Sequence, residues 1–406
     1  MKLLKVDTID EARNKILNHV KSWQLKTQTI AVTESQNRIL AEDVFASCDI
    51  PSFNRSTVDG YAVIASDTSG ATDSIPVLLK QTGSVSMGKE VDFSICSGEC
   101  AYVPTGAMLP NGTDAVVMIE YCESAGETIA VYESVAVGSG MITIGEDFKK
   151  GKLLLKKGTL IRPQEIGALS AAGITNVNVY IQLTLCIFST GDELVDPQDD
   201  PAPGEVRDIN TNMLRALIVK HGYDVVLTQV FLDDETLLEA AVKEAMKKCD
   251  IVMISGGSSQ GDKDFTAKVF NRVAKPGVFT HGLALKPGKP TILGWDEDSK
   301  TLLVGLPGHP VSAMMVFTLL FSTGIIHHND SAFPIPARIS CNVPGAPGKI
   351  LCQPIVLKLM NDFYFAEPVF GKAGMISTLT QADGFIIIDM NKEGLKKDEP
   401  VLVHLF

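Results

Sequence analysis

The chain has 406 residues and a formal net charge of −12, with 45% hydrophobic and 21% charged residues. This length exceeds what one ordinary hydrophobic core supports, so we expect several domains of an ordinary soluble globular protein. The negative charge argues against nucleic acid as a main partner. An anionic ligand would need locally clustered lysines, arginines or backbone N–H groups to overcome the overall repulsion.

We expect a cytoplasmic protein without a membrane segment. Residues 1–20 lack an apolar core followed by a small-residue cleavage site, which argues against a secretory signal. The longest uncharged run, residues 310–326, is short for a membrane span and is better explained as a helix packed under a sheet. None of the eight cysteines forms a C-x-x-C pair, so we expect reduced, buried thiols and no zinc site.

An amphipathic helix is predicted near the N-terminus. Thr8 and Glu11 have the spacing of a capping box, and apolar residues then recur at helical spacing up to Val20. The apolar stripe of this helix would cover a core or a partner subunit.

The next part of the chain is poor in helix signals. Residues 64–145 contain short apolar runs separated by Gly, Pro, Asn and Ser, which is typical of a small β-domain. A helix follows over residues 164–172 and ends at Gly173. We expect this later segment to pack back against residues 1–50, which would make that domain discontinuous.

From residue 181 strands and helices alternate, which predicts a doubly wound, mostly parallel sheet with helices on both faces. The expected strands cover residues 183–188, 225–230, 251–254 and 302–304. The expected helices cover residues 211–221, 235–248 and 265–273, with a last helix after Pro310. Short β runs return after Pro334 and predict a small C-terminal barrel or sheet.

The sequence thus predicts a multidomain α/β protein. The four expected domains are a discontinuous N-terminal domain (residues 1–50 and 146–180), an inserted β-domain (51–145), a central α/β domain (181–330) and a C-terminal barrel-like β-domain (331–406). We find no internal repeat and no low-complexity tract.

Residues 251–264 carry the clearest candidate site. A buried apolar strand breaks at Ser255-Gly256-Gly257-Ser258-Ser259, where two glycines let backbone N–H groups approach an anion closely. Asp264, just beyond, could hold a divalent cation against that anion. The alternative is a tight strand-to-helix turn with a capping aspartate.

The unusual loops of the α/β region all follow strands. In a parallel sheet, ligands bind beyond the carboxyl ends of the strands, so these loops would share one edge. They are residues 189–193, 233–234, 255–257 and 305–310. Residues 286–290 (Lys-Pro-Gly-Lys-Pro) join them as a stiff turn with two lysines, the local positive charge that an anionic substrate needs, although solvated surface lysines would look the same.

Seven motifs occur in a fixed order along the chain. They are Asn54-x-x-x-x-Asp59-Gly60-Tyr61-Ala62, Thr105-Gly106-Ala107, Gly145-Glu146-Asp147, Ser189-Thr190-Gly191-Asp192-Glu193-Leu194, Ser255-Gly256-Gly257, Lys286-Pro287-Gly288-Lys289-Pro290 and Gly305-Leu306-Pro307-Gly308-His309-Pro310-Val311-Ser312-Ala313. Together they resemble the molybdopterin molybdenumtransferase family, which includes the bacterial molybdenum insertases and the E domain of gephyrin, over about residues 5–405.

The resemblance implies a four-domain homodimer whose α/β domain is similar to molybdopterin adenylyltransferases. It implies Mg²⁺-dependent insertion of molybdate into adenylyl-molybdopterin with release of AMP. The upstream adenylyltransferase and the acceptor molybdoenzymes would then be protein partners.

The resemblance also assigns roles to residues of this chain. The residues expected to take part in catalysis are Asp59, Asp147, Lys286 and Lys289. Those expected to bind the substrate are Thr105, Asp233, Gly256, Gly257, Ser258, Ser259, Pro290, Pro307 and Pro310. Those expected to hold Mg²⁺ are Glu193 and Asp264. Lysines, hydroxyls and glycine N–H groups suit oxyanions, carboxylates suit Mg²⁺, and the chemistry would be positioning and charge neutralisation without a covalent nucleophile.

The chain departs from the family pattern at three places. Residues 141–144 (Met-Ile-Thr-Ile) replace common arginines, Gly282 replaces a lysine, and residues 372–374 (Lys-Ala-Gly) replace a loop that often supplies a serine. These losses leave two alternatives open: a homologue that inserts tungstate, and a dimeric binding scaffold with weakened catalysis.

Overall fold

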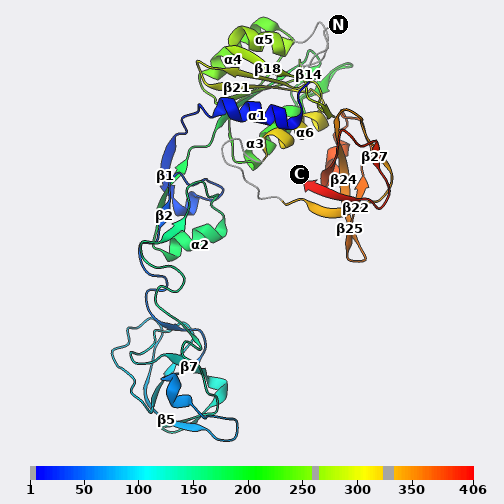
Figure 1. Cartoon of the computed structure of the whole chain (residues 1–406). Helices are drawn as coiled ribbons and strands as arrows, with labels where there is room; N and C mark the ends of the chain where they lie inside the picture. The colour runs from blue at the N-terminus through cyan, green and yellow to red at the C-terminus, as the bar shows by residue number, and fades with distance from the viewer. Residues whose placement is uncertain (1–5, 258–264, 323–332) are drawn as a thin grey trace. The chain divides into compact units, whose positions relative to one another are not determined.

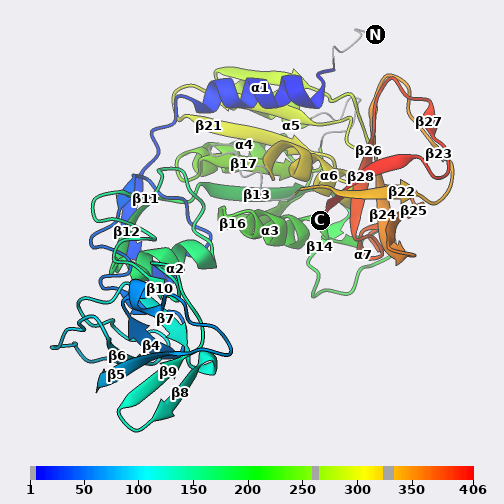
Figure 2. The same cartoon turned by 60° about the horizontal axis from the view of Figure 1, so that its bottom comes forward.

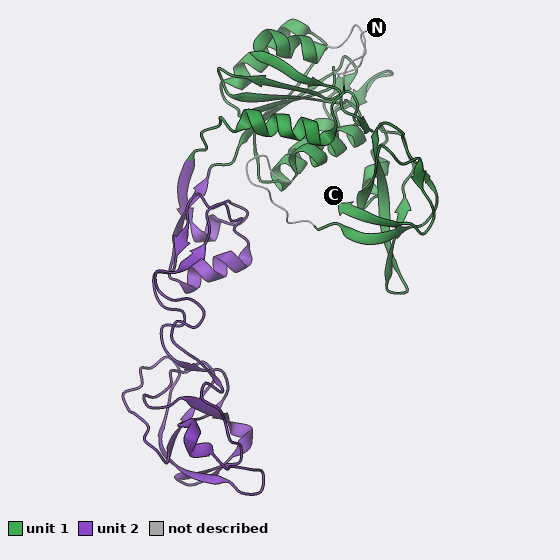
Figure 3. Cartoon of the chain, viewed as in Figure 1, with its two compact units in different colours: residues 1–26, 181–406 green, residues 27–180 purple. Residues whose placement is uncertain are grey.

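The computed structural model describes residues 6–257, 265–322 and 333–406. The chain divides into two compact units, residues 1–26 with 181–406 and residues 27–180 (Figure 3). Each unit has its own buried apolar clusters, so each is described by itself.

A six-stranded sheet forms the centre of the first unit (Figure 2). Across the sheet, the strands are β16 (Asp224–Phe231), β13 (Thr184–Thr190), β17 (Ile251–Ser255), β21 (Thr301–Leu306), β20 (Ile292–Asp296) and β18 (Pro276–His281). The first four are parallel, and β20 is antiparallel to both its neighbours. The mostly parallel sheet predicted from the alternation is confirmed.

Helices cover both faces of this sheet (Figure 1). They are α1 (Ile9–Val20), α3 (Asn210–Lys220), α4 (Glu235–Met246), α5 (Phe265–Val273) and α6 (Pro310–Phe321). Because side chains alternate along a strand, Leu185 and Ile187 pack with α1, α3 and α6, whereas Cys186 and Phe188 pack with α4 and α5. The predicted capping box of α1 is confirmed, and the Asp234 side chain caps α4.

The C-terminal part of the first unit is a small β-barrel. Five strands close it because β24 pairs with both β25 and β26. They are β24 (Ile350–Met360), β25 (Phe363–Pro368), β22 (Ile335–Ile339), β28 (Pro400–Leu405) and β26 (Gly384–Ile388). The barrel-like domain predicted after Pro334 is therefore confirmed.

Short elements complete this unit. They are β14 (Leu194–Val195), β15 (Val206–Arg207), β19 (Leu285–Lys286), β23 (Val343–Pro344), β27 (Gly394–Leu395) and α7 (Ser377–Thr380). β19 pairs with β24 of the barrel, so the segment that carries the two candidate lysines begins against the barrel.

The second unit is mainly β-structure. Its largest sheet has the order β7 (Ala115–Met118), β4 (Gly60–Val63), β6 (Glu99–Val103), β5 (Val77–Ser84), β9 (Thr128–Val131) and β8 (Cys122–Ala125). This unit also contains helix α2 (Pro163–Ala171) and three strand pairs. The pairs are β1 (Thr27–Ala31) with β12 (Asn176–Tyr180), β2 (Val44–Phe45) with β11 (Leu153–Leu155), and β3 (Arg55–Ser56) with β10 (Met141–Ile142).

Residues 27–50 and 147–180 lie together through the β1–β12 and β2–β11 pairs. Helix α1 instead belongs to the first unit, where its buried residues share a cluster with the sheet residues Leu185 and Trp295. The reason is its apolar stripe, which covers the sheet face that α3 and α6 also cover.

Helix α6 ends at Phe321, and nine of its residues are buried. It lies within the uncharged run that we predicted to be a helix packed under a sheet and not a membrane span. Within the described ranges, none of the helices is both long enough and apolar enough to cross a membrane.

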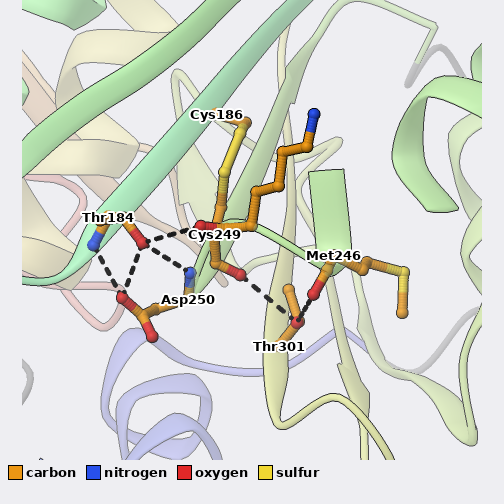
Figure 4. Close-up of a disulfide and its surroundings, with 7 residues drawn as sticks. Thr184, Cys186, Met246, Cys249, Asp250 and Thr301 are labelled. Carbon is orange, nitrogen blue, oxygen red and sulfur yellow. Dashed lines mark hydrogen bonds between the residues drawn. A yellow bond between two sulfur atoms is a disulfide. The ribbon is translucent and has the colours of Figure 1, made fainter. Parts of the chain in front are cut away.

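A disulfide joins Cys186 of β13 to Cys249, which precedes β17 (Figure 4). The parallel pairing of these strands, with Leu185 opposite Ile251, places the two Cα atoms 6.3 Å apart although 63 residues separate them in sequence. The prediction that the cysteines are reduced is wrong for this pair; the other six are free. Sequence spacing could not reveal the bond because it depends on strand order.

Candidate functional site

The loops that follow β16, β13, β17 and β21 form one row at the carboxyl edge of the sheet, as expected from the sheet's direction. The backbone N–H of Asp233 donates to Asp192 Oδ1 at 3.0 Å, and Gly191 N–H donates to Phe231 O at 3.2 Å. These contacts join the ends of β16 and β13. The next two strand ends are joined by Gly256 N–H, which donates to Leu306 O at 3.3 Å.

Neither of the two glycines after β17 could carry a side chain without backbone strain or crowding. Gly256 and Gly257 have φ values of +105° and +60°. A Cβ on Gly256 would lie 2.3 Å from the carbonyl oxygen of Thr190, and a Cβ on Gly308 would lie 3.6 Å from Gly256 Cα. The backbones of the loops after β13, β17 and β21 therefore lie in direct contact. An anion site lined by backbone N–H groups requires such close packing.

The glycine N–H groups are not equivalent. That of Gly256 already donates to Leu306 O, and the carbonyl of Gly256 accepts a hydrogen bond from Thr266 Oγ1 at 3.3 Å. Among the residues that the structure describes, the N–H of Gly257 has no acceptor. Gly257 is thus better suited than Gly256 to bind an anion. The expected ligands Ser258, Ser259 and Asp264 lie outside the described residues.

The candidate metal ligand Glu193 is exposed at the same edge. Its carboxylate folds back over Gly191, where a Cβ would come within 2.7 Å of Oε2. Within residues 6–257, 265–322 and 333–406, no three His, Cys, Asp or Glu side chains cluster closely enough to hold a metal by themselves. Glu193 can therefore supply one oxygen ligand, and any further ligands would have to come from elsewhere.

The lysine loop is rigid. Gly288 has a φ of +126°, and a Cβ there would lie 2.7 Å from Val316 Cγ2 of α6. The carbonyl of Lys289 accepts hydrogen bonds from Leu283 N and Thr291 N, both at 2.9 Å. Lys286 is exposed, and Lys289 and Pro290 are half-buried. The backbone that carries both lysines is held between α6 and the barrel strand β24.

The Gly-Leu-Pro-Gly-His-Pro loop connects β21 to α6. Pro307 and Pro310 are buried, whereas Gly308 and His309 are exposed. Val311 N–H donates to Ala373 O at 3.2 Å, and a Cβ on Gly374 would lie 3.2 Å from His309 Cδ2. The segment that replaces the family's serine-bearing loop therefore packs against this loop.

The remaining candidates belong to the second unit. The Asp59 carboxylate accepts hydrogen bonds from Thr105 N at 2.7 Å and Thr105 Oγ1 at 3.0 Å. The backbone and side-chain hydrogen bonds from Thr105 lower the pKa of this carboxyl. Asp147 is exposed. Hydrogen bonds from Thr143 lower the pKa of its sequence neighbour, Glu146. Asp59 and Thr105 are thus joined directly by two hydrogen bonds.

Sequence reasoning missed a group of buried polar side chains at the start of α3. Asp208 and Asn210 are 4% and 8% exposed, and both bind strand-end residues. The available signal was the segment Asp208-Ile209-Asn210-Thr211, in which two short polar side chains open a predicted helix. It reads as an ordinary helix cap until the sheet edge is known.

Three family models match the chain in succession. They are the MoeA N-terminal region (domain I and II) over residues 7–173, a probable molybdopterin binding domain over residues 186–327, and the MoeA C-terminal region (domain IV) over residues 336–406.

A molybdopterin molybdenumtransferase of Staphylococcus aureus is 32% identical over 387 residues, which cover 95% of this chain and 87% of the relative. The chain belongs to the MoeA family. A putative molybdopterin biosynthesis protein of Methanocaldococcus jannaschii is 33% identical and covers 94% of this chain and 92% of the relative. The crystal structure of a MoeA protein from Pyrococcus horikoshii matches with a TM-score of 0.85 and 29% identity, covering 99% of this chain and all of the other. The MoeA-type multidomain fold is thereby confirmed.

Proposed function

We propose that this protein is a transferase of molybdenum cofactor biosynthesis that inserts molybdate into adenylyl-molybdopterin and releases AMP. The observation that carries the proposal is the row of strand-end loops, in a chain whose relatives include named molybdopterin molybdenumtransferases. The glycines, the rigid lysine loop and an exposed carboxylate on that unit are the groups that a pyrophosphate, an oxyanion and a cation require.

In the proposed mechanism, the chain positions charged groups and neutralises their charge. The N–H of Gly257 binds a phosphoryl oxygen, and Lys286 and Lys289 attract the doubly charged oxyanion. Binding in the correct orientation removes most of the entropic barrier to the exchange. We propose that the protein is a homodimer, in which Asp59, Thr105 and Asp147 on the β-domain of one subunit would complete the site of the other. We also propose a cytoplasmic location.

Glu193 is the described residue that fits Mg²⁺. Its carboxylate is a hard oxygen donor, exposed beside the glycine loop. Mg²⁺ usually keeps several waters and binds one or two carboxylates together with substrate phosphates, so a single described carboxylate is compatible with this metal. When bound, the metal would neutralise charge on the pyrophosphate.

The test is AMP release from adenylyl-molybdopterin by the purified chain, with molybdate and Mg²⁺ added together or singly. We expect release only with both. Lys286→Ala should reduce the rate about tenfold or more, whereas Lys247→Ala, at an exposed lysine that caps the C-terminus of α4 and pairs with Glu244, should not change it. Release that is indifferent to molybdate, Mg²⁺ and Lys286 would refute the proposal.

Tungstate insertion is the second candidate, favoured by the loss of the usual lysine at Gly282. The backbone there has a φ of +105°, and its N–H and C=O are bonded to Thr291 O and Asp7 N. An altered cationic environment would change the preference between two oxyanions of the same charge. Direct competition between molybdate and tungstate in the same assay separates the two candidates. A chain that binds a protein partner but turns over neither would be the weakened scaffold.

A further inference from the structure

Five polar side chains form a layer of two hydrogen-bonded groups between the start of α3 and the ends of β13 and β17. They are Ser189, Asp208, Asn210, Thr211 and Ser255. Ser189 and Ser255 are paired neighbours on adjacent strands, so this layer lies directly under the carboxyl edge of the sheet. Four of the five are buried and Thr211 is half-buried, and buried polar groups are normally all paired.

Asn210 connects this layer to the Gly308 loop. Its Nδ2 donates to Ser255 Oγ at 2.8 Å and to the carbonyl oxygen of Gly308 at 2.7 Å. A carbonyl oxygen can only accept, so the amide atom that faces Gly308 must be the nitrogen. Both amide hydrogens are used, and the orientation of the whole amide group is fixed.

The amide oxygen of Asn210 is left over. It is buried, and it has no hydrogen-bond partner in the part of the chain that the structure describes. Each of the other four side chains in the layer has a partner. A residue that only held Gly308 in place would not need an unpaired buried acceptor, which is unfavourable. Because Gly308 itself is exposed, Asn210 lies one residue below the surface of the site.

We propose that Asn210 is a substrate-recognition residue, whose Oδ1 accepts a hydrogen bond from a neutral donor group of the substrate bound at this edge. The inference rests on the proposed function. The fixed amide can only accept here, so it repels the phosphate and molybdate oxygens, which are anionic acceptors. The neutral nitrogen and oxygen donors in adenylyl-molybdopterin are the N–H groups of the pterin, the amino group of adenine and the hydroxyls of the ribose. An enzyme that pairs a buried acceptor with a substrate donor rejects analogues that lack the donor.

The experiment measures binding of adenylyl-molybdopterin, molybdopterin and AMP to the full-length chain by calorimetry. Asn210→Ala should weaken binding of adenylyl-molybdopterin about tenfold to a hundredfold, because the donor loses its partner on binding. A matching loss with molybdopterin assigns the donor to the pterin, and a loss with AMP assigns it to the adenosine part, either the ribose or the adenine amino group. Ser255→Ala removes one contact of the amide nitrogen but keeps the oxygen, so its affinities should stay within about threefold of the wild type.

Two results would overturn the inference alone: Asn210→Ala binding all three ligands as the wild type does, or Ser255→Ala losing as much affinity as Asn210→Ala, which would make Asn210 a structural clamp. A wild-type chain that binds none of the three ligands would overturn the proposed function and this inference with it. Melting temperatures of all variants are recorded, and Asn210→Ser, which also lacks the amide oxygen, replaces the alanine variant if that fails to fold.

Discussion

The hydroxyl oxygen of Thr190 lies 3.1 Å from the position that a Cβ on Gly257 would occupy, although Thr190 ends β13 and Gly257 follows β17. Thr266 Oγ1 lies 3.0 Å from the same position, on the first turn of α5. A side chain at position 257 would therefore crowd hydroxyl groups from two elements, whereas glycine leaves both in place.

Gly257→Ala should damage both stability and binding. A residue with a Cβ at φ +60° loses roughly 1–2 kcal/mol in the left-handed region, and the new methyl would crowd two hydroxyls. Thermal unfolding and ligand titration measure the two effects. Gly126→Ala is the matched control, since it has a φ of +71° with nothing within 4 Å of the Cβ position. If both variants behave alike, the crowding at position 257 has no consequence.

Thr190→Val should leave the fold intact or strengthen it slightly. The Thr190 hydroxyl is buried and has no hydrogen-bond partner within the described ranges, and valine has the same shape without a polar atom. Replacing an unpaired buried hydroxyl by an isosteric methyl is neutral or stabilising, by up to about 1 kcal/mol. Chemical denaturation measures this, with Thr190→Ser as the variant that keeps the hydroxyl. A clear loss of stability in the valine variant alone would show that the hydroxyl is paired.

The sheet could be predicted because each of its signals is local. The buried apolar run before Ser255, the helix caps and the alternation after residue 181 depend on neighbours in the sequence, and all were found in place. The position of α1 could not be predicted in this way. Its amphipathic pattern shows that one face is buried, but does not show which surface covers it.

The site could be predicted only in part for the same reason. Glycine loops at the ends of parallel strands are recognisable because strand direction places them on one edge. Asn210 was missed because its importance comes from Gly308, which is 98 residues away in sequence and is brought close by strand order. The disulfide between Cys186 and Cys249 was missed for the same reason.

Gly282→Lys should not restore the lysine that many family members carry. Gly282 has a φ of +105°, and a Cβ would lie 3.0 Å from Val6 Cγ1, while Asp7 N–H donates to its carbonyl. We expect a loss of at least about 1 kcal/mol in the free energy of unfolding, measured by denaturant titration, without a gain in oxyanion affinity. A stable variant with tighter oxyanion binding would show that the segment at Val6 yields to the side chain.

Reduction should lower the melting temperature. The bond between Cys186 and Cys249 has a sequence separation of 63 residues, and the chain-entropy model gives roughly 4 kcal/mol for a loop of that size. Calorimetry with and without a phosphine reductant measures the change, with a Cys186→Ala/Cys249→Ala variant as the control that reductant should not affect. Alkylation under non-reducing, denaturing conditions should modify the six free cysteines. Eight modified residues would contradict the bond.

Acid should remove the stability that the Asp59–Thr105 contact contributes, but at a lower pH than an ordinary aspartate needs for protonation. The hydrogen bonds from Thr105 lower the pKa of Asp59 from its ordinary value of 3.8. A carboxyl whose pKa is lower in the folded chain contributes stability that is fully present above the unfolded pKa and is lost as the pH falls through the folded pKa. The difference in melting temperature between wild type and Asp59→Asn should therefore be constant from pH 7 to about pH 5 and shrink below about pH 4. Asp73→Asn, at an exposed carboxyl in the same unit, serves as the control. A difference that grows on acidification would mean that the folded chain favours the protonated carboxyl, contrary to the contact with Thr105.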